Sequence, residues 1–595
     1  MYFRDKFIIQ FFCRFLFMGL FSVFVALSGC KKEDKEKKAD KEAEITKKIA
    51  DGAILHKSAI KNKGEEKVYD IKAEKGQLLD LNLTNEPAAS TPVAYTMEIK
   101  DPAGNRIVRV HDRDGSDGAV RLRTRVFAAT EGEYKVHVYD WSKTNVDPAN
   151  PFELTIKKME ALDKNEPNQG KNIDGHRSLA TKLPMEKVVE GYIEFHNDED
   201  WFKFQGKKNS IVDITLTNAP ATSSPVKYTM EMWGSKSNKR IWRMRGVDGS
   251  KGTTVLKSRR YISEDGDYFL NIRDWNGDNY ERKNPYKLTV KKVDVSDKNE
   301  PNNGANTDTS RSLATPIESD KSVEGLIGYQ EDEDWYKIRI QKGKLLKIEL
   351  TNAPATSSTV SYTLSMWNSK DKKRMWRLRG GDGGSGTTTI KTVAYAPIED
   401  DYFLRVYDWN NSNYEDQKTY KFTVEILENP DLNEPNNGQN FDASKIMATP
   451  IAKGKSIQGF IEYRKDYDWF VVDHKGGELA VSLANEPLVS SRVDFTLALH
   501  DENGKRLGRE YNRDGSSGTT SLTLKKEVPA GKYYISVSDW SDDDFGLKEA
   551  YSLSYGGKPS PVEIKEAEPK ESAGSDSEKE DESDKEDSKE STDDK

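Results

Sequence analysis

The dipeptide Asp-Trp returns along this chain at a nearly constant interval. Successive tryptophans are 134, 134 and 131 residues apart, at Asp140-Trp141, Asp274-Trp275, Asp408-Trp409 and Asp539-Trp540. An Asp-Gly pair keeps a similar step, beginning at Asp114, Asp248, Asp382 and Asp514. Repetition of this length indicates a row of similar domains rather than one large core, and 595 residues are enough for about four domains.

The repeats divide the chain into seven expected segments. Residues 1–29 are expected to be a signal peptide and residues 30–50 a charged tether. The four repeats are expected to span residues 51–160, 161–293, 294–427 and 428–557, and an acidic tail residues 558–595. An Asn-Glu-Pro-Asn motif opens repeats two, three and four at Asn165, Asn299 and Asn433.

Each repeat has the residue pattern of an all-β unit. In repeat three, Tyr336, Ile338 and Ile340 alternate with polar or exposed positions, and several further segments do the same. Alternation with a period of two predicts antiparallel strands that are buried on one side. About eight short strands per repeat, with no helical period long enough for a crossover, predict four tandem jelly-roll-like β-sandwiches.

The N-terminal segment has the pattern of an export signal. Lys6 and Arg14 border and interrupt an apolar run that ends at Cys30, before a charged stretch. The small residues before Cys30 resemble the lipobox of bacterial lipoproteins, which implies diacylation of the Cys30 sulfur and cleavage before it. A transmembrane anchor is the alternative, but it requires about 20 apolar residues, and Gln10 and Arg14 interrupt the run.

The acidic character of the chain is concentrated in its C-terminal tail. The formal net charge is −8. Residues 566–595 contain fourteen acidic residues and five lysines, so the remaining chain is almost neutral. A neutral folded part predicts no nucleic-acid partner. The tail has no aromatic residue after Lys558 and is predicted to be disordered, as is the charged stretch of the tether.

The order of motifs within a repeat resembles the bacterial pre-peptidase C-terminal domain. The resemblance rests on Asn-Glu-Pro-Asn, on Val323-Glu-Gly-Leu-Ile, on Asp332-Glu-Asp-Trp-Tyr and on Asp401-Tyr-Phe-Leu-Arg-Val in repeat three. It implies a jelly-roll-like sandwich of the kind found beside secreted peptidases, including the collagen-binding modules of clostridial collagenases. Repeat one departs most, because Lys67-Val68 stands where the other repeats have the Asp-Trp of the Asp-x-Asp-Trp motif.

The same resemblance implies calcium sites at the start of repeats two, three and four. In collagenase modules an acidic linker and an acidic pair entering a strand bind calcium together, and Ca²⁺ takes six to eight oxygen ligands. Alternatively, these residues cap turns and remain solvated. Extra ligands are not evident in repeat four, where Lys465 lies beside the pair. The candidate ligands are Glu166, Asn168, Asp198, Asp200, Glu300, Asn302, Asp332, Asp334, Glu434, Asn436, Asp466 and Asp468.

A partner-binding face is predicted on repeats two and three. Strand alternation places Trp233 and Trp367 opposite the apolar residues of their strands, with Arg243 and Arg377 facing outward on the next strand. Tryptophan beside arginine can stack on a sugar or a peptide. The alternative is that a loop or a neighbouring repeat covers these tryptophans. The recurring Asp-Trp pairs are interpreted as structural elements of each sandwich.

The sequence contains no catalytic signature. Its seven histidines share no common repeat position, and neither His-Glu-x-x-His nor Gly-x-Ser-x-Gly occurs. We therefore expect a non-enzyme, anchored in the cell envelope through Cys30 and placed in the outer membrane if the source is a diderm. Two functions remain: non-catalytic binding or adhesion to a protein or glycan, and an envelope spacer or accessory subunit of a secreted protein.

Replacing Cys30 with alanine should release the protein from membranes. A diacyl group supplies two chains, and two chains give stable attachment where one is marginal. Cell fractionation should find Cys30→Ala in the soluble fraction, whereas Cys13→Ala, which lies inside the predicted signal, should remain with the membranes. A Cys30→Ala chain that still pellets and resists carbonate extraction would contradict the lipid anchor.

Overall fold

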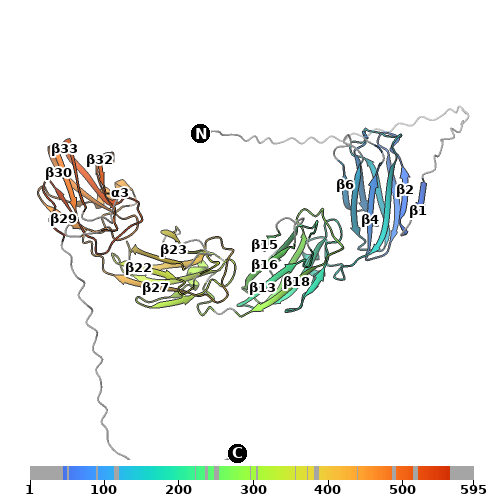
Figure 1. The fold of residues 1–595 in the computed structure, drawn as a ribbon, viewed down its shortest axis with the longest axis horizontal. Helices are drawn as coiled ribbons and strands as arrows, with labels where there is room; N and C mark the ends of the chain where they lie inside the picture. Colours follow the sequence, from blue (N-terminus) through green and yellow to red (C-terminus); the bar gives the residue numbers. More distant parts are fainter. Residues whose placement is uncertain are drawn as a thin grey trace, which may run out of the picture. The chain divides into compact units, whose positions relative to one another are not determined.

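The fold was analysed in a computed structural model (Figure 1). The structure describes residues 45–562 apart from 50–51, 87, 89–90, 113–119, 222, 235–238, 247–252, 295–296, 303, 305, 356, 371–372, 381–386, 439, 486–490 and 513–519. The predicted signal peptide, Cys30 and most of the acidic tail lie outside the described residues. The chain divides into two compact units, Met1–Glu160 and Ala161–Lys595.

Repeat one forms the first unit and contains two antiparallel sheets. One sheet has the order β1-β2-β9-β4-β7 and the other β3-β8-β5-β6. The strands are β1 (Ile45–Lys48), β2 (Ile54–Ser58), β3 (Glu66–Ala73), β4 (Gln77–Thr84), β5 (Tyr95–Lys100), β6 (Arg106–His111), β7 (Arg121–Phe127), β8 (Gly132–Asp140) and β9 (Phe152–Glu160). Residues 45–48 were expected in the tether, but they pair with β2 and form the edge of the first sheet.

Repeat two places nine strands in two sheets. Their orders are β10-β12-β17-β14-β15 and β11-β18-β13-β16. The elements are α1 (Ile173–Leu179), β10 (Thr181–Lys182), β11 (Val189–Gly191), β12 (Glu199–Gly206), β13 (Ser210–Thr217), β14 (Tyr228–Trp233), β15 (Arg240–Arg245), β16 (Val255–Ile262), β17 (Gly266–Asp274) and β18 (Tyr286–Val293).

Repeat three has the same topology as repeat two. Its sheets are β19-β21-β26-β23-β24 and β20-β27-β22-β25. The elements are α2 (Thr307–Leu313), β19 (Thr315–Pro316), β20 (Ser322–Gly325), β21 (Glu333–Ile340), β22 (Leu345–Thr351), β23 (Tyr362–Asn368), β24 (Trp376–Arg379), β25 (Thr389–Tyr395), β26 (Asp400–Asp408) and β27 (Tyr420–Leu427).

Repeat four joins the equivalent strands into one continuous seven-stranded sheet. Its two longest strands, β30 and β33, pair along nearly their whole length, through the Gly476-Gly477 segment where positive φ angles bend the chain. The elements are α3 (Phe441–Met447), β28 (Thr449–Pro450), β29 (Ser456–Gly459), β30 (Tyr467–Ala484), β31 (Phe495–His500), β32 (Arg506–Tyr511), β33 (Ser521–Asp539) and β34 (Tyr551–Tyr555).

The fold-class prediction is confirmed. Each repeat has its own cluster of buried apolar residues between its layers of strands. Strand β21 illustrates the alternation, because Tyr336, Ile338 and Ile340 are buried in the core while Arg339 is exposed. The chain is therefore an all-β, tandem series of jelly-roll-like sandwiches. Among the described residues no helix has the length and apolar character needed to cross a bilayer.

Three short helices were not anticipated from the sequence. Each follows an Asn-Glu-Pro-Asn motif and begins after an asparagine whose side chain accepts a backbone N–H of the first turn. These N-cap residues are Asn172, Asn306 and Asn440. The helices are seven residues long, so a periodicity search over longer windows does not find them.

The outward tryptophans predicted on repeats two and three are covered rather than free. Trp367 is 6% exposed and belongs to a small second core with Trp335 and Phe403. Trp233 packs against the equivalent cluster of repeat two, together with Ile173 of α1. The prediction that Trp367 is exposed is therefore wrong. Trp335, Phe403 and Ala314, which follows α2, pack on the side of its strand that was expected to face solvent.

Candidate metal centres

An aspartate orders the loop that opens each of repeats two, three and four. In repeat two, Asp163 accepts hydrogen bonds from the backbone N–H of Tyr192 at 2.6 Å and of Asn165 at 2.7 Å. Asp297 and Asp431 accept the equivalent bonds in the next two repeats. These bonds tie the linker to the short strand that begins each sandwich. As a result, the Glu-Pro-Asn segment that follows lies against the start of β12, β21 or β30.

The structure brings the predicted carboxylates together in three equivalent clusters. Within each cluster, one oxygen from each of three carboxylates lies within 4.8 Å of the others. The linker provides the glutamate, and the residues around the start of β12, β21 or β30 provide the two aspartates. The clusters are Glu166, Asp198 and Asp200; Glu300, Asp332 and Asp334; and Glu434, Asp466 and Asp468.

The predicted asparagine and the two predicted aspartates of repeat two illustrate the local geometry. Asn168 donates from Nδ2 to Oδ1 of Asp200 at 3.0 Å, and the Tyr286 hydroxyl donates to Oδ2 of Asp200 at 2.6 Å. Asp198 accepts the backbone N–H of Glu194 at 2.6 Å. Asn302 and Tyr420 bind Asp334 in the same way. Neither tyrosine was predicted, because each comes from a strand far along the sequence.

The clusters are buried and contain oxygens without hydrogen-bond partners. Asp200, Asp334 and Asp468 are all 0% exposed. In repeat two, Oε1 of Glu166, Oδ1 of Asn168 and Oδ1 of Asp198 have no partner among the described residues. Buried acceptors without partners are costly. A cation with oxygen ligands would satisfy all three, so the residues present fit calcium.

Burial gives the carboxyl groups unusual protonation behaviour. Desolvation, followed by the nearby Asp163, raises the pKa of Glu166 to about 8. Desolvation and Asp466 raise the pKa of Glu434 to about 9. Burial also raises the pKa of Asp334 well above its ordinary value. Without a cation, each cluster therefore favours protonated carboxyl groups near neutral pH.

Repeat four contains an acidic residue that the sequence did not single out. Glu462 is 0% exposed, and neither of its carboxylate oxygens has a hydrogen-bond partner among the described residues. In repeat two the corresponding Glu194 binds Arg282 at 2.8 Å, and repeat three has Gly328 there. Repeat four therefore has a further buried carboxylate, Glu462, in the place where the sequence showed no extra candidate ligand.

Repeat one lacks a comparable cluster among its described residues. Glu65 occupies the position of Asp198 and accepts the backbone N–H groups of Lys61 and Asn62, at 2.5 and 2.9 Å. Glu66 instead binds His137 at 2.7 Å. The departure of repeat one from the common motif thus coincides with the absence of the carboxylate cluster from its described residues.

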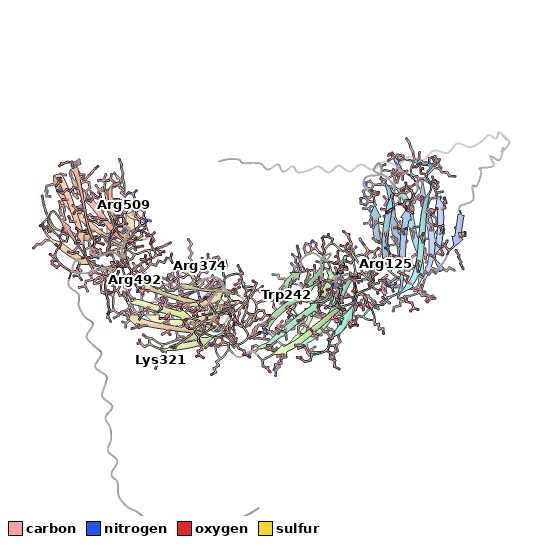
Figure 2. The ribbon with its side chains drawn as sticks, in the orientation of Figure 1. Arg125, Trp242, Lys321, Arg374, Arg492 and Arg509 are labelled. Carbon is pink, nitrogen blue, oxygen red and sulfur yellow. The ribbon has the colours of Figure 1, made fainter. Side chains whose placement is uncertain are left out.

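The Asp-Trp pairs combine a structural residue with an accessible one. Asp274 accepts the backbone N–H groups of Lys227, Asn276 and Asp278 and thereby orders the loop after β17. The Arg243 guanidinium lies 4.9 Å from the ring centroid of Trp275. Equivalent arginine–tryptophan pairs are Arg109–Trp141, Arg377–Trp409 and Arg509–Trp540, at 4.7, 4.3 and 4.4 Å. Figure 2 shows the side chains, with Arg509 labelled in repeat four.

The arginines predicted for partner binding therefore lie beside different tryptophans from those expected. Arg243 and Arg377 are exposed, but they stack on Trp275 and Trp409 instead of completing a surface with Trp233 and Trp367. Each arginine lies on the edge strand β15 or β24, and its side chain stacks on the tryptophan that follows β17 or β26. Trp141, in the same position of repeat one, is 46% exposed.

Comparison with known proteins yields likeness only at the level of solved structures. No family model and no curated protein matches the chain. A pre-peptidase C-terminal domain of collagenase from Bacillus anthracis is 19% identical, with a TM-score of 0.14, over 18% of this chain and 93% of that chain. The CBM22-1–CBM22-2 tandem domain of Paenibacillus barcinonensis Xyn10C is 8% identical, with a TM-score of 0.15, over 40% and 86%.

In a chelator, the protein should become less stable as the pH rises from about 4.5 to about 9. The raised pKa values of Glu166 and Glu434 mean that the folded state binds protons more tightly than the unfolded state. Their contribution to the free energy of unfolding is fully present below pH 4.5, the ordinary pKa of a glutamate. It is lost as the pH passes about 8 for Glu166 and about 9 for Glu434. Melting temperatures across this range measure the effect.

Calcium should oppose this loss, because it stabilises the ionised carboxylates. A melting temperature that rises between pH 5 and pH 9 in the chelator would contradict the electrostatic description of the clusters.

Proposed function

We propose that the protein is a lipid-anchored component of the cell envelope that displays calcium-binding β-sandwich repeats for non-catalytic binding to a protein or glycan. Cys30 provides the membrane attachment, and calcium occupies the clusters of repeats two, three and four. The observation that carries the proposal is the threefold recurrence of a buried carboxylate cluster where each linker meets its sandwich, each with at least one buried carboxylate or asparagine oxygen that has no hydrogen-bond partner among the described residues.

The clusters are joined to the contacts between successive repeats. The Tyr329 hydroxyl donates to Glu300 at 3.3 Å, and the Tyr329 ring stacks on Tyr261 of the preceding repeat with centroids 5.4 Å apart. A cavity of about 380 Å³ beside this stack is lined by Glu300 and Asp332. A cation bound there would hold Glu300, and through Tyr329 it would restrain the junction. Calcium thus stiffens the array as well as each repeat.

The arginine–tryptophan pairs support the binding role. Each of the four repeats contains one such pair, with the arginine on the edge strand β6, β15, β24 or β32 and the tryptophan directly after β8, β17, β26 or β33. Several copies of the pair can therefore bind a repetitive partner. Linked weak sites gain affinity through multivalency. Tryptophan and arginine are also the residue types most enriched at the centres of binding surfaces.

An envelope spacer or accessory subunit is the second candidate function. It is favoured by the polar contacts between repeats two and three, where Arg259 forms ion pairs with Asp213 in its own repeat and with Asp416 in the next. A stiff junction suits a spacer even without a ligand. Protease treatment of whole cells distinguishes the roles, since surface display predicts cleavage and a buried spacer predicts protection.

The protein should bind three calcium ions, and Asp334→Ala should reduce the number to two. Each site should stabilise its repeat by about 2.7 kcal/mol at one hundred times its dissociation constant. Isothermal titration of chelator-treated protein gives the stoichiometry, and melting curves give the stabilisation. Asp401, a partly exposed residue of β26 in the same repeat, provides the matched control, and Asp401→Ala should retain all three. Binding that is unchanged by Asp334→Ala would refute the assignment of the site.

Replacing Trp141, Trp275, Trp409 and Trp540 together with alanine should strongly weaken partner binding and leave the fold intact. None of the four belongs to the buried core clusters. The probes are soluble type I collagen and an immobilised glycan array, and Lys391→Ala is an exposed control. We expect a loss of at least about tenfold, because several linked contacts disappear together. Equal binding by the fourfold variant, or no binding of either probe by the parent protein, favours the spacer.

A further inference from the structure

Repeats two, three and four are joined by two junctions that share one feature. Tyr261 stacks on Tyr329 between repeats two and three, and Tyr395 stacks on Tyr463 between repeats three and four. The centroid distances are 5.4 and 5.5 Å, and the interplanar angles are 19° and 12°. The two tyrosine pairs occupy equivalent positions, so the residues around them can be compared one by one.

In the first junction an arginine fills the space beside the tyrosine pair. Arg260 is 9% exposed, and its guanidinium lies 5.1 Å from the ring centroid of Trp242. It forms an ion pair with Glu331 at 3.3 Å and donates to the backbone oxygen of Gln330 at 3.5 Å. Trp242 is consequently only 5% exposed. On the Trp242 side, the first junction is closed by side chains of the protein itself.

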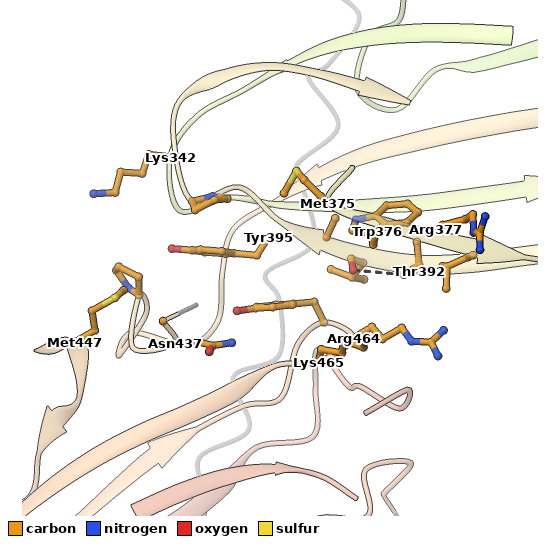
Figure 3. A pocket seen from close by; sticks show the side chains of 17 residues that line it. Lys342, Met375, Trp376, Arg377, Thr392, Tyr395, Asn437, Met447, Arg464 and Lys465 are labelled. Carbon is orange, nitrogen blue, oxygen red and sulfur yellow. Dashed lines mark hydrogen bonds between the residues drawn. The ribbon is translucent and has the colours of Figure 1, made fainter. Parts of the chain in front are cut away.

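In the second junction these residues are replaced and the space is open. Ala394 stands in the position of Arg260, and Trp376, the equivalent of Trp242, is only partly buried. A cavity of about 770 Å³ remains, within the range of about 300 to 1,000 Å³ that is usual for ligand pockets. Its walls include Trp376, Tyr395 and Tyr463, with Met375 and Met447 at the side (Figure 3).

The charge of the pocket has also changed sign. Arg464 and Lys465 stand where the first junction has Gln330 and Glu331. Both are exposed, and neither is paired with a carboxylate among the described residues. None of the described residues that line the pocket is acidic. Figure 3 shows Arg464 and Lys465 across the pocket from Trp376 and Tyr395, which come from the preceding repeat. An apolar, aromatic chamber thus has a cationic rim.

We infer that the pocket between repeats three and four binds a small aromatic anion, such as an aromatic carboxylate or sulfonate. The ring system lies against Trp376 and the tyrosine pair, in the space that the Arg260 side chain fills in the other junction. The anionic group pairs with Arg464 and Lys465, because guanidinium and ammonium groups bind anionic oxygens through charge-assisted hydrogen bonds. Aromatic rings are favoured occupants because they stack on the aromatic walls. The pocket contains none of the clustered carboxylates, although Pro435 and Lys465 adjoin the cluster of repeat four and Arg377 of the Arg377–Trp409 pair lies in its lining.

Anilinonaphthalene sulfonate is a suitable probe, since it combines two aromatic ring systems with one anionic group. Residues 31–595, which include every described residue, are titrated with it in millimolar calcium, and fluorescence gives the affinity and the stoichiometry. We expect one saturable site. Ala394→Arg should weaken it at least about tenfold by filling the pocket, even though the added positive charge attracts anions. Arg464→Gln with Lys465→Gln should weaken the sulfonate but leave binding of the uncharged N-phenylnaphthylamine nearly unchanged.

The first junction provides a gain-of-function control. Arg260→Ala, Gln330→Arg and Glu331→Lys together reproduce the second junction and should create a second sulfonate site, while Arg260→Ala alone should not. Melting curves establish that each variant is folded. The inference is overturned if the parent chain shows no saturable binding, or if a folded Ala394→Arg chain binds the probe as the parent does. If Ala394→Arg does not fold, the Arg464→Gln, Lys465→Gln chain decides, and equal sulfonate affinity in it overturns the inference.

Discussion

Repulsion between carboxylates that are buried together is the interaction on which the rest of the unit from Ala161 to Lys595 depends. In repeats two and four, no lysine or arginine of the described chain forms an ion pair with the clustered residues. The negative charges must therefore be removed by protonation or balanced by a cation. A tyrosine hydroxyl and backbone N–H groups around each cluster, joined by the asparagine amide in repeats two and three, satisfy some of the oxygens and leave others open. This arrangement is poor for an apo protein and suited to a metal site.

Much of the fold and part of the site could be predicted from the sequence, because both depend on short-range patterns. The alternation of Tyr336, Ile338 and Ile340 reveals a half-buried strand, and the spacing of Asp332 and Asp334 places two carboxylates on the same side of it. Tyr420 and Glu462 could not be assigned in this way. Tyr420 reaches Asp334 from 86 positions away, and the importance of Glu462 depends on the absence of a partner for its buried carboxylate.

The tryptophans show why strand alternation alone misjudges exposure. Period-two alternation correctly separates Trp367 from Tyr362 and Met366, which lie in the main core. It cannot show that a second layer covers the other side. That layer depends on the linker, whose asparagine-capped helix is only seven residues long and was not anticipated. Once the linker is ordered by its aspartate, Trp335 and Trp367 become a small core of their own, with ring centroids 4.9 Å apart. The polar side of a strand is thus not always its solvent side.

The positions that stack at the two junctions differ in the first and last repeats. An aromatic residue, Phe195, Tyr329 or Tyr463, follows the short strand β11, β20 or β29 in repeats two to four. Repeat one has Asn62 at this position. A second aromatic residue, Phe127, Tyr261 or Tyr395, lies at or near the end of β7, β16 or β25 in repeats one to three. Repeat four has Glu527 of β33 at this position. Asn62 and Glu527 are both exposed. A stacked repeat buries an apolar surface against its neighbour, and a terminal repeat needs a polar surface to remain soluble and to stop further stacking. Asn62 and Glu527 thus place polar side chains at positions where the junctions between repeats two, three and four place aromatic ones.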